Sequence, residues 1–469
     1  MSLALTSLLA LVTIIVISCV FPRVNPGLPA IIAALIIGTA LADMSVKSVL
    51  SGFPADLFLL LVGVCAVFGI AQENGTLPAL VQKVVPLIRG RAVLVPLLLF
   101  LISFVLAAIG PGNIAAVALL ATVAMTMAAR YEISPLLIAI MIVTGANAGA
   151  FSPFAPTGVI AAGLMDDIGL QSDTLIWVVF AAAAVLQSLT AFGAWGIYLA
   201  RRRRREVVAA DAARAARPPA RPRNIPAPSG MMPARPMLLL AGAGIGVGSP
   251  KLLPARAGGP APAADSPAPG LTHPQWATIA LIILMILGVL LFDAPLVLMA
   301  FIVVAVMTFA RLGDLETVMR DLPWGTILMV TGIAVLISLM EKTGGLDLAT
   351  TLIASVTRPQ FINAALALIT GIVSAYSSSS GVVMPAFIPL VPGLAEKMGI
   401  VDQVVRMVIS VCVGSHMVDV SPLSTLGALA LAAIPIKAQR DRAFRGLLIW
   451  GMSMAVVGAV LAFVFLDLL

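Results

Sequence analysis

The stretch that decides how this chain folds reads G-S-H-M-V-D-V-S-P-L-S-T-L-G, from Gly414 to Gly427. It is polar and rich in helix-breaking residues, yet it lies between long apolar segments. A shift of 269 residues places it on Gly145 to Gly158, which reads G-A-N-A-G-A-F-S-P-F-A-P-T-G. Without a gap, the same shift pairs identical residues along the chain, including Pro26/Pro295, Pro54/Pro323, Gly63/Gly332, Gly75/Gly344, Leu77/Leu346, Gly112/Gly381, Gly145/Gly414, Ser152/Ser421, Pro153/Pro422 and Gly158/Gly427. The sequence therefore predicts a duplication.

The composition excludes a soluble globule. Hydrophobic residues make up 61% of the chain and charged residues 10%, and the mean hydropathy is +1.11. So little charge cannot cover the surface of a water-soluble domain of this length. Several apolar runs approach the roughly 20 residues that a spanning helix needs: residues 3–20, 28–42, 57–71, 279–291 and 296–310. The sequence predicts an all-α polytopic membrane protein.

The net charge of +7 comes from one segment. Residues 201–272 hold 12 of the 28 Lys and Arg and 3 of the 21 Asp and Glu, so the segment carries +9 and the rest of the chain −2. It opens with Arg201 to Arg205 and continues rich in Ala, Pro, Gly and Arg, which is typical of a disordered linker. This charge distribution favours a cytoplasmic loop under the positive-inside rule over a nucleic-acid partner.

The linker divides the chain into two repeats, residues 1–200 and 273–469. Each repeat has a pair of apolar segments joined at a polar tip, at about 93–128 and 361–395, followed by a broken helix, at about 134–165 and 402–436. Each pair is either a re-entrant hairpin or two full spans, and the Gly112/Gly381 match favours the hairpin because it indicates a shared buried tip. Residues 77–89 are amphipathic and predict a helix in the membrane interface.

The basic residues orient the repeats. A cytoplasmic linker places Arg130 and the loop with Lys83 inside, and the second repeat places Lys437 and Arg440 inside. Each repeat then crosses the membrane an odd number of times, and both termini are periplasmic. We expect an inverted-topology repeat of about ten transmembrane helices plus two re-entrant hairpins in the lipid bilayer.

Paired broken elements in an inverted repeat point to the binding site of a secondary transporter, because irregular backbone at membrane depth is tolerated where it lines a cavity. Half-helices that start at the two tips and the two breaks aim positive dipole ends at the cavity, which favours an anion. No Lys or Arg occurs in any of the four. The predicted substrate-binding residues are Asn113, Asn147, Ser152, Thr157, Ser377, Ser378, Ser379, Ser380, Gly381, Ser421, Ser424 and Thr425.

Most of these residues also have a structural interpretation. The serines from Ser377 to Ser380 can bond back to helix carbonyls. Asn113 and Asn147 can cap half-helices. The Ser-Pro pairs of the two breaks fix the start of the next half-helix.

His416 and Asp419 are three residues apart, close enough to meet on one helical turn. An ionisable residue inside the membrane is a functional candidate. An ionised Asp419 would repel an anionic substrate, so it is protonated, binds a cation or pairs with His416; a buried structural pair is the other interpretation. The predicted residues for coupling to Na⁺ or H⁺ are Gly112, Asn113, Gly145, Asn147, Gly414, His416 and Asp419.

Four segments resemble the MatC-type malonate/dicarboxylate carriers, which belong with the divalent-anion symporters of the ion transporter superfamily: F-P-R-V-N-P-G-L-P-A (21–30), F-P-A-D-L-F-L-L-L-V-G-V followed by E-N-G-T (53–64, 73–76), A-Y-S-S-S-S-G-V-V-M-P (375–385) and V-G-S-H-M-V-D-V-S-P-L-S-T-L-G-A-L (413–429). The resemblance covers nearly the whole chain except the linker. It implies a homodimer with scaffold and transport domains, an elevator mechanism, and dicarboxylate uptake coupled to Na⁺ or H⁺ across the bacterial inner membrane. Better-known members carry Ser-Asn-Thr at both tips, where this chain has Gly-Pro-Gly-Asn and Ser-Ser-Ser-Ser-Gly.

The leading hypothesis is therefore a secondary active transporter for a small dicarboxylate, with no cofactor other than Na⁺ as a possible coupling ion. A passive anion channel needs the same helix dipoles without alternating access. An intramembrane serine hydrolase is a third hypothesis, with Ser379 or Ser380 activated by His416 and oriented by Asp419.

Overall fold

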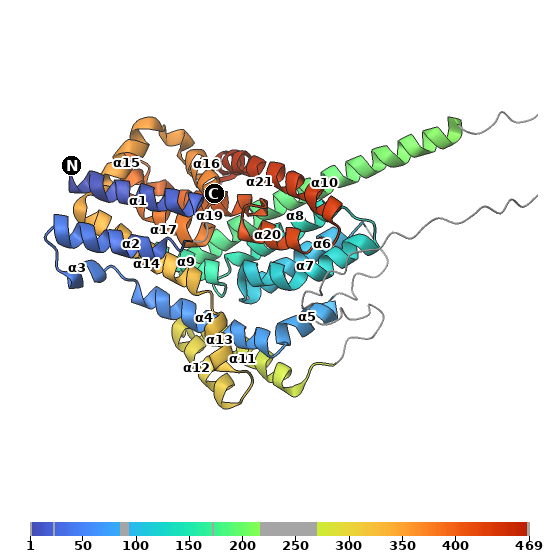
Figure 1. Cartoon of the computed structure of the whole chain (residues 1–469), viewed down its shortest axis with the longest axis horizontal. Coiled ribbons are helices and arrows are strands. Elements are labelled where there is room, and N and C mark those ends of the chain that lie inside the picture. Colours follow the sequence, from blue (N-terminus) through green and yellow to red (C-terminus); the bar gives the residue numbers. More distant parts are fainter. Residues whose placement is uncertain (1, 22–23, 85–92, 171–172, 216–269, 467–469) are drawn as a thin grey trace, which may run out of the picture. The chain divides into compact units, whose positions relative to one another are not determined.

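The structure is a computed structural model that describes residues 2–21, 24–84, 93–170, 173–215 and 270–466 (Figure 1). Residues Met1–Leu199 and Gly270–Leu469 form one compact unit, and Ala200–Pro269 form a second. Every regular element of the described residues is a helix. Nine of these helices are long and apolar enough to cross a membrane, or ten if the bent pair Gly345–Val356 and Pro359–Ser374 is one span. The predicted all-α polytopic class is confirmed.

The helices of the first half follow the predicted order of spans, hairpin and broken helix. They are α1 (Leu3–Val20), α2 (Gly27–Ile36) with a π turn to Leu41, α3 (Val46–Leu50), α4 (Ala55–Glu73), α5 (Thr76–Val84), α6 (Val95–Ile109), α7 (Gly112–Arg130), α8 (Pro135–Ala150), α9 (Pro156–Asp167) and α10 (Asp173–Ala215).

The helices of the second half repeat this order. They are α11 (His273–Phe292), α12 (Leu296–Phe309), α13 (Leu315–Asp321), α14 (Trp324–Thr343), α15 (Gly345–Val356), α16 (Ile362–Ser374), the irregular segment η4–α17–η5–α18 (Ser379–Met398), α19 (Val404–Met417), η7 (Val418–Val420), α20 (Thr425–Ala432) and α21 (Lys437–Phe465). Six pairs of helices start 269 residues apart: α2 and α12, α3 and α13, α4 and α14, α5 and α15, α8 and α19, and α9 and α20. The shift found in the sequence is therefore also the register of the helices.

In each half, one helix packs against a helix of the other half. Helix α2 packs on α14, and its equivalent α12 packs on α4. The matched glycines explain the close approach, because a Cβ on Gly332 would lie 2.3 Å from the carbonyl oxygen of Gly27, and one on Gly63 would lie 3.2 Å from the Cβ of Ala300. Small residues at such crossings let membrane helices approach closely.

Hydrogen bonds at both ends of α4 and α14 show that these helices run in opposite directions. The carboxylate of Glu73, at the end of α4, accepts from the amide of Asp314, just before α13 and α14. At the other end, Lys342 near the end of α14 donates to the carbonyl of Ser48, just before α4. The ring centroids of Phe58 and Trp324 lie 6.5 Å apart, so the two helices meet at their starts and extend in opposite directions. Because α4 and α14 are equivalent under the 269-residue shift, this reciprocal arrangement is what an inverted repeat predicts.

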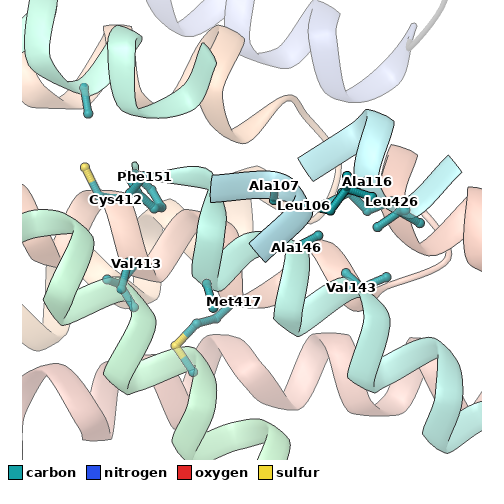
Figure 2. Packing of buried hydrophobic residues seen from close by; sticks show 14 of the residues in the cluster. Leu106, Ala107, Ala116, Val143, Ala146, Phe151, Cys412, Val413, Met417 and Leu426 are labelled. Carbon is teal, nitrogen blue, oxygen red and sulfur yellow. The ribbon is translucent and has the colours of Figure 1, made fainter. Parts of the chain in front are cut away.

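The hairpins and the broken helices pack against one another. Helix α6 packs along α8, α16 along α19, and α20 reaches across to α7 of the other half. Figure 2 shows Leu106, Ala107 and Ala116 of the first hairpin grouped with Leu426 of α20. Small side chains at these contacts bring polar backbone at the breaks close to the hairpin tips.

One boundary differs from the sequence prediction. The linker was placed from residue 201, but α10 continues to Ala215. The segment 201–215 is rich in Arg and Ala, which have high helix propensity and extend the helix beyond its apolar part. The amphipathic helix at 77–89 is α5 as far as Val84; its remaining residues, and linker residues 216–269, lie outside the described residues.

Candidate functional site

The two helix breaks have the same backbone turn. In the first, the amide of Phe154 donates to the hydroxyl of Ser152 over 3.4 Å; in the second, Leu423 donates to Ser421 over 3.3 Å. The carbonyls of these serines accept from Ala155 and Ser424, over 2.9 and 3.0 Å. Such local serine bonds hold a chain in a turn in place of a helix.

The next residues of both breaks are equally constrained. A Cβ on Gly158 would lie 2.0 Å from the Ser152 carbonyl oxygen, and one on Gly427 would lie 2.0 Å from that of Ser421. Only glycine fits against such a turn without moving backbone. The motif S-P-x-x-x-x-G therefore specifies where each second half-helix starts.

Four helix starts converge on one cavity of about 550 Å³. They are the starts of α7, α9 and α20 and of the segment that begins at Ser379, contributed by both hairpin tips and both breaks. The residues at or near these four helix starts that line the cavity are Gly110, Pro111, Gly112, Asn113, Pro156, Thr157, Ser377, Ser378, Ser379, Ser380, Asp419, Ser424 and Thr425. Helix α9 has no side-chain cap among the described residues, so its first amides are available to a ligand.

Helices α4, α13 and α14 form the opposite wall. Phe68, Gln72 and Glu73 come from α4, and Asp321 and Thr326 from α13 and the start of α14. Among the described residues that line the cavity, Glu73, Asp321 and Asp419 are the charged types, and none is Lys or Arg. An anion bound here would rely on helix N-termini, hydroxyls and amides.

Asn147 joins the first hairpin to the second break. Its side-chain oxygen accepts from the Nδ2 of Asn113 over 2.9 Å, and its own Nδ2 donates to the carbonyl oxygen of His416 over 2.8 Å. Asn147 and His416 are equivalent positions of the two repeats and are completely buried. The two halves therefore meet at these residues, as expected where a pseudo-two-fold axis passes between them.

His416 connects this bond to the second hairpin. Its Nδ1 lies 2.8 Å from the carbonyl oxygen of Cys412, which can only accept, so Nδ1 carries a hydrogen. In the neutral ring, Nε2 then accepts from the hydroxyl of Ser380 at 3.0 Å. The oxygen of Ser380 lies 3.2 Å from the hydroxyl of Thr157, at the start of α9.

Asp419 bonds to the neighbouring serine of the same tip. Ser379 donates to its Oδ1 over 2.7 Å, and the oxygen of Ser379 lies 2.6 Å from that of Ser374. Ser424, which caps α20, donates to the backbone carbonyl of Asp419. The two ionisable residues of the second break thus hold two adjacent serines of the hairpin tip.

The structure sorts the predicted residues into two groups. Those that line the cavity are Gly112, Asn113, Thr157, Ser377, Ser378, Ser379, Ser380, Asp419, Ser424 and Thr425. Those that are buried behind the lining residues are Gly145, Asn147, Ser152, Gly381, Gly414, His416 and Ser421. Of this second group, Ser152 and Ser421 shape the turns, and Asn147 and His416 link the lining residues to one another.

Sequence reasoning missed the wall formed by α4 and α13. Glu73 and Asp321 stand at helix ends, where charged residues are ordinary. It also missed Ser18 of α1, whose hydroxyl lies 2.8 Å from that of Ser377. Only the four-serine run gave any signal for this contact between α1 and the second hairpin.

The arrangement that a serine hydrolase would need is not formed. Ser380 does contact His416, but the Nδ1 of the ring bonds to the Cys412 carbonyl and Asp419 bonds to Ser379. Asp419 therefore does not orient the histidine.

Apolar helices long enough to span a membrane, with broken helices that enclose a polar cavity, define the class: a multi-pass membrane protein with a polar cavity at its helix breaks. Residues 1–150 match the family described as dicarboxylate carrier protein MatC N-terminus. The resemblance to MatC-type dicarboxylate carriers is thereby confirmed over these residues, and the match supports a dicarboxylate transporter. No curated protein matched the chain.

Proposed function

We propose that this protein is a secondary active transporter that carries a small dicarboxylate, malonate or a C4 acid such as succinate, across the bacterial inner membrane. The observation that carries the proposal is the convergence of four helix starts on one cavity that, among the described residues, is lined by no Lys or Arg. Helix N-termini combine free amides with positive dipole ends and bind carboxylates well. The family match over residues 1–150 supports the dicarboxylate class.

The proposed mechanism is an elevator-type movement. The cavity lies between one group of helices, α4, α13 and α14, and a second group of hairpins and broken helices. In an elevator the second group moves with the substrate while the first stays fixed. The two groups contact each other where α4 packs on α9 and where α14 packs on η4 and α17. A homodimer would hold the fixed group in the membrane.

The proposed driving force is coupling to Na⁺ or H⁺. Asp419 lines the cavity beside the hydroxyls of Ser379 and Ser424, so a cation bound there or a proton would offset its charge next to an anion. The described residues contain no group of three or more His, Cys, Asp and Glu side chains able to hold a metal ion. The coupling cation would therefore be bound by hydroxyl and carbonyl oxygens with one carboxylate.

Proteoliposomes with purified protein test the proposal. Counterflow of labelled malonate, succinate and citrate identifies the substrate, and the same assay with varied Na⁺ and pH identifies the coupling ion. Active transport predicts uptake against a gradient that collapses with an ionophore. Downhill flux alone would support an anion channel instead. Liposomes with the Asn147→Ala protein are the comparison. We expect them to transport less, because Asn147 links the two repeats.

A further inference from the structure

A carboxylate side chain lies in the wall of a cavity proposed to bind a dianion. Asp419 is 6% exposed, and this exposed part faces the cavity. Glu73 and Asp321 line the opposite wall. Because no Lys or Arg of the described residues lines the cavity, a fully ionised dicarboxylate would be placed beside like charges without a compensating cation.

The hydroxyl groups of Ser379 and Ser380 cannot donate to the substrate, because their hydrogens are already donated within the protein. Ser379 donates its hydrogen to Asp419. Ser380 donates its hydrogen to the Nε2 of His416, because the Nδ1 of that ring already donates to the Cys412 carbonyl. The oxygens of Ser379 and Ser380 and the carboxylate of Asp419 therefore form a wall of acceptors, which we name the acceptor wall.

The tip of the first hairpin and the start of α9 provide hydrogen-bond donors instead of acceptors. Helix α7 begins at Gly112 and α9 at Pro156, and neither has a side-chain cap among the described residues. Pro156 has no amide hydrogen and the amide of Ile114 already donates to the Asn113 side chain. The donors are therefore the amides of Gly112 and Asn113 in α7 and of Thr157 and Gly158 in α9, at the positive ends of helices of 19 and 12 residues. The cavity thus has a donor end that suits a carboxylate and an acceptor wall that suits a hydrogen-bond donor.

We propose that the species carried is the singly protonated dicarboxylate, with its carboxylate at the donor end and its carboxyl hydrogen donated to the acceptor wall. This inference rests on the proposed function and adds the ionic form of the substrate. One proton then enters with each substrate molecule, and the repulsion between substrate and Asp419 becomes a hydrogen bond. A charge-assisted bond of this kind is among the stronger ones in proteins.

In the part of the chain that the structure describes, the elements packed around Asp419 place no other cation beside it. The elements packed on η7 are α8, α16, α19, α20 and α21. Helices α8, α16 and α20 carry no Asp, Glu, Lys, Arg or His. Helix α19 contributes Arg406, Cys412 and His416, of which His416 is occupied as described, and Arg406 lies more than two turns before it. The charged residues of α21, from Lys437 to Arg445, precede Gly451, which contacts Ser421 beside η7.

Analogues with one fixed charge test the inference. Malonamate has a carboxylate and an amide that donates hydrogen bonds, so it resembles hydrogen malonate at any pH. Monomethyl malonate has the same charge but no donor. Above the second ionisation of malonate, we expect malonamate to inhibit labelled malonate counterflow roughly tenfold better than the methyl ester, as one bond predicts. As the pH rises, malonate uptake should decrease in parallel with the concentration of hydrogen malonate, with or without Na⁺.

The Asp419→Asn variant removes the negative charge and replaces one of the two acceptor oxygens with an NH2 donor. We expect it to lose the preference for malonamate over the methyl ester and to take up malonate with little dependence on pH. Gly193→Ala, on an exposed face of α10 with no atom within 4 Å, is the matched control and should keep both.

The outcomes separate the inference from the proposed function. Counterflow of malonate that ignores pH, with malonamate and the methyl ester equally weak, overturns the inference and leaves the transporter intact. Uptake of the dianion that requires Na⁺ at every pH also overturns it, in favour of a sodium ion between substrate and Asp419. Absence of counterflow for all dicarboxylates at all pH values, by protein that is folded, would reject the proposed function itself.

Discussion

The first broken helix, α8 to α9, and the second, α19 to α20, have the same turn but different polar chemistry. Ser152 and Ser421 make the same bonds, and Gly158 and Gly427 lie equally close to them. In the first break, however, Asn147 occupies the position of His416, and Ala150 that of Asp419. The duplicated backbone places helix starts symmetrically for an anion, whereas the side chains of the second break alone carry ionisable groups.

This difference assigns separate tasks to the two breaks. The first break is neutral and contributes amides and the hydroxyl of Thr157. The second break holds Ser379 and Ser380 through Asp419 and His416. Substitutions that disturb the shared backbone turn should therefore have equal effects at equivalent positions of the two breaks. Substitutions of the ionisable side chains, which only the second break carries, should have effects that their equivalents in the first break do not.

The largest effect is expected for Gly158→Ala and Gly427→Ala. Each new Cβ would lie 2.0 Å from a serine carbonyl oxygen, so backbone must move in a packed region. Overpacking costs about 1–3 kcal/mol and occasionally more, and here the obstacle is a backbone atom. We expect both variants to lose monodisperse protein in detergent, with Gly193→Ala as the unaffected control. If one variant stayed monodisperse and the other did not, the two turns would not be structurally equivalent.

Asn147→Ala should have the next largest effect. It removes the bond from Asn113 and leaves the buried carbonyl of His416 without its donor. An unsatisfied buried group costs about 1–3 kcal/mol. We expect normal expression, a lower thermal midpoint and weaker transport. Asn113→Ala removes the bond to Asn147 and the local bond from the Ile114 amide, but it leaves the His416 carbonyl paired and should lower the midpoint less. Unchanged kinetics for Asn147→Ala would place the binding site elsewhere.

His416→Asn gives the second break the residue of the first and tests their chemical asymmetry. The change removes the bonds to Ser380 and to the Cys412 carbonyl and the edge-on contact with Phe151, whose ring centroid lies 4.7 Å away. The backbone carbonyl at position 416 still accepts from Asn147, so folding should survive with a loss of about 1 kcal/mol. We expect transport to fall because Ser380 is no longer oriented. Wild-type kinetics in this variant would show that the asymmetry has no functional role.

The sequence predicts the register of the two repeats well because Pro and Gly mark the helix starts. The pair Pro54 and Pro323 stands immediately before α4 and α14, and the glycines of the breaks are required by backbone contacts. The repeat also identifies both tips and both breaks as one site. These features are local, so they are visible in a linear pattern.

Other features depend on where the two halves meet in space. The contact between Asn147 and His416 depends on the position of the pseudo-two-fold axis, which no local pattern encodes. The sequence predicts that His416 and Asp419 meet on one helical turn. In the structure, Asp419 instead bonds to Ser379 and His416 to Ser380. Helix α4 lines the cavity with Phe68 and Gln72, but its sequence is that of any apolar span.

The smallest effect is expected for Ser152→Ala and Ser421→Ala, which test the shared turn without disturbing the cavity. Each hydroxyl accepts one bond, from Phe154 or Leu423, at 3.4 or 3.3 Å, near the limit for a hydrogen bond. Removing such a bond should lower the free energy of unfolding by about 0.5–1 kcal/mol. Because both serines are buried behind the lining residues, transport should be retained in both variants. Equal shifts of the thermal midpoint would indicate that the duplicated backbone still performs one task in both halves, whereas loss of transport in one variant alone would give that serine a direct role in binding.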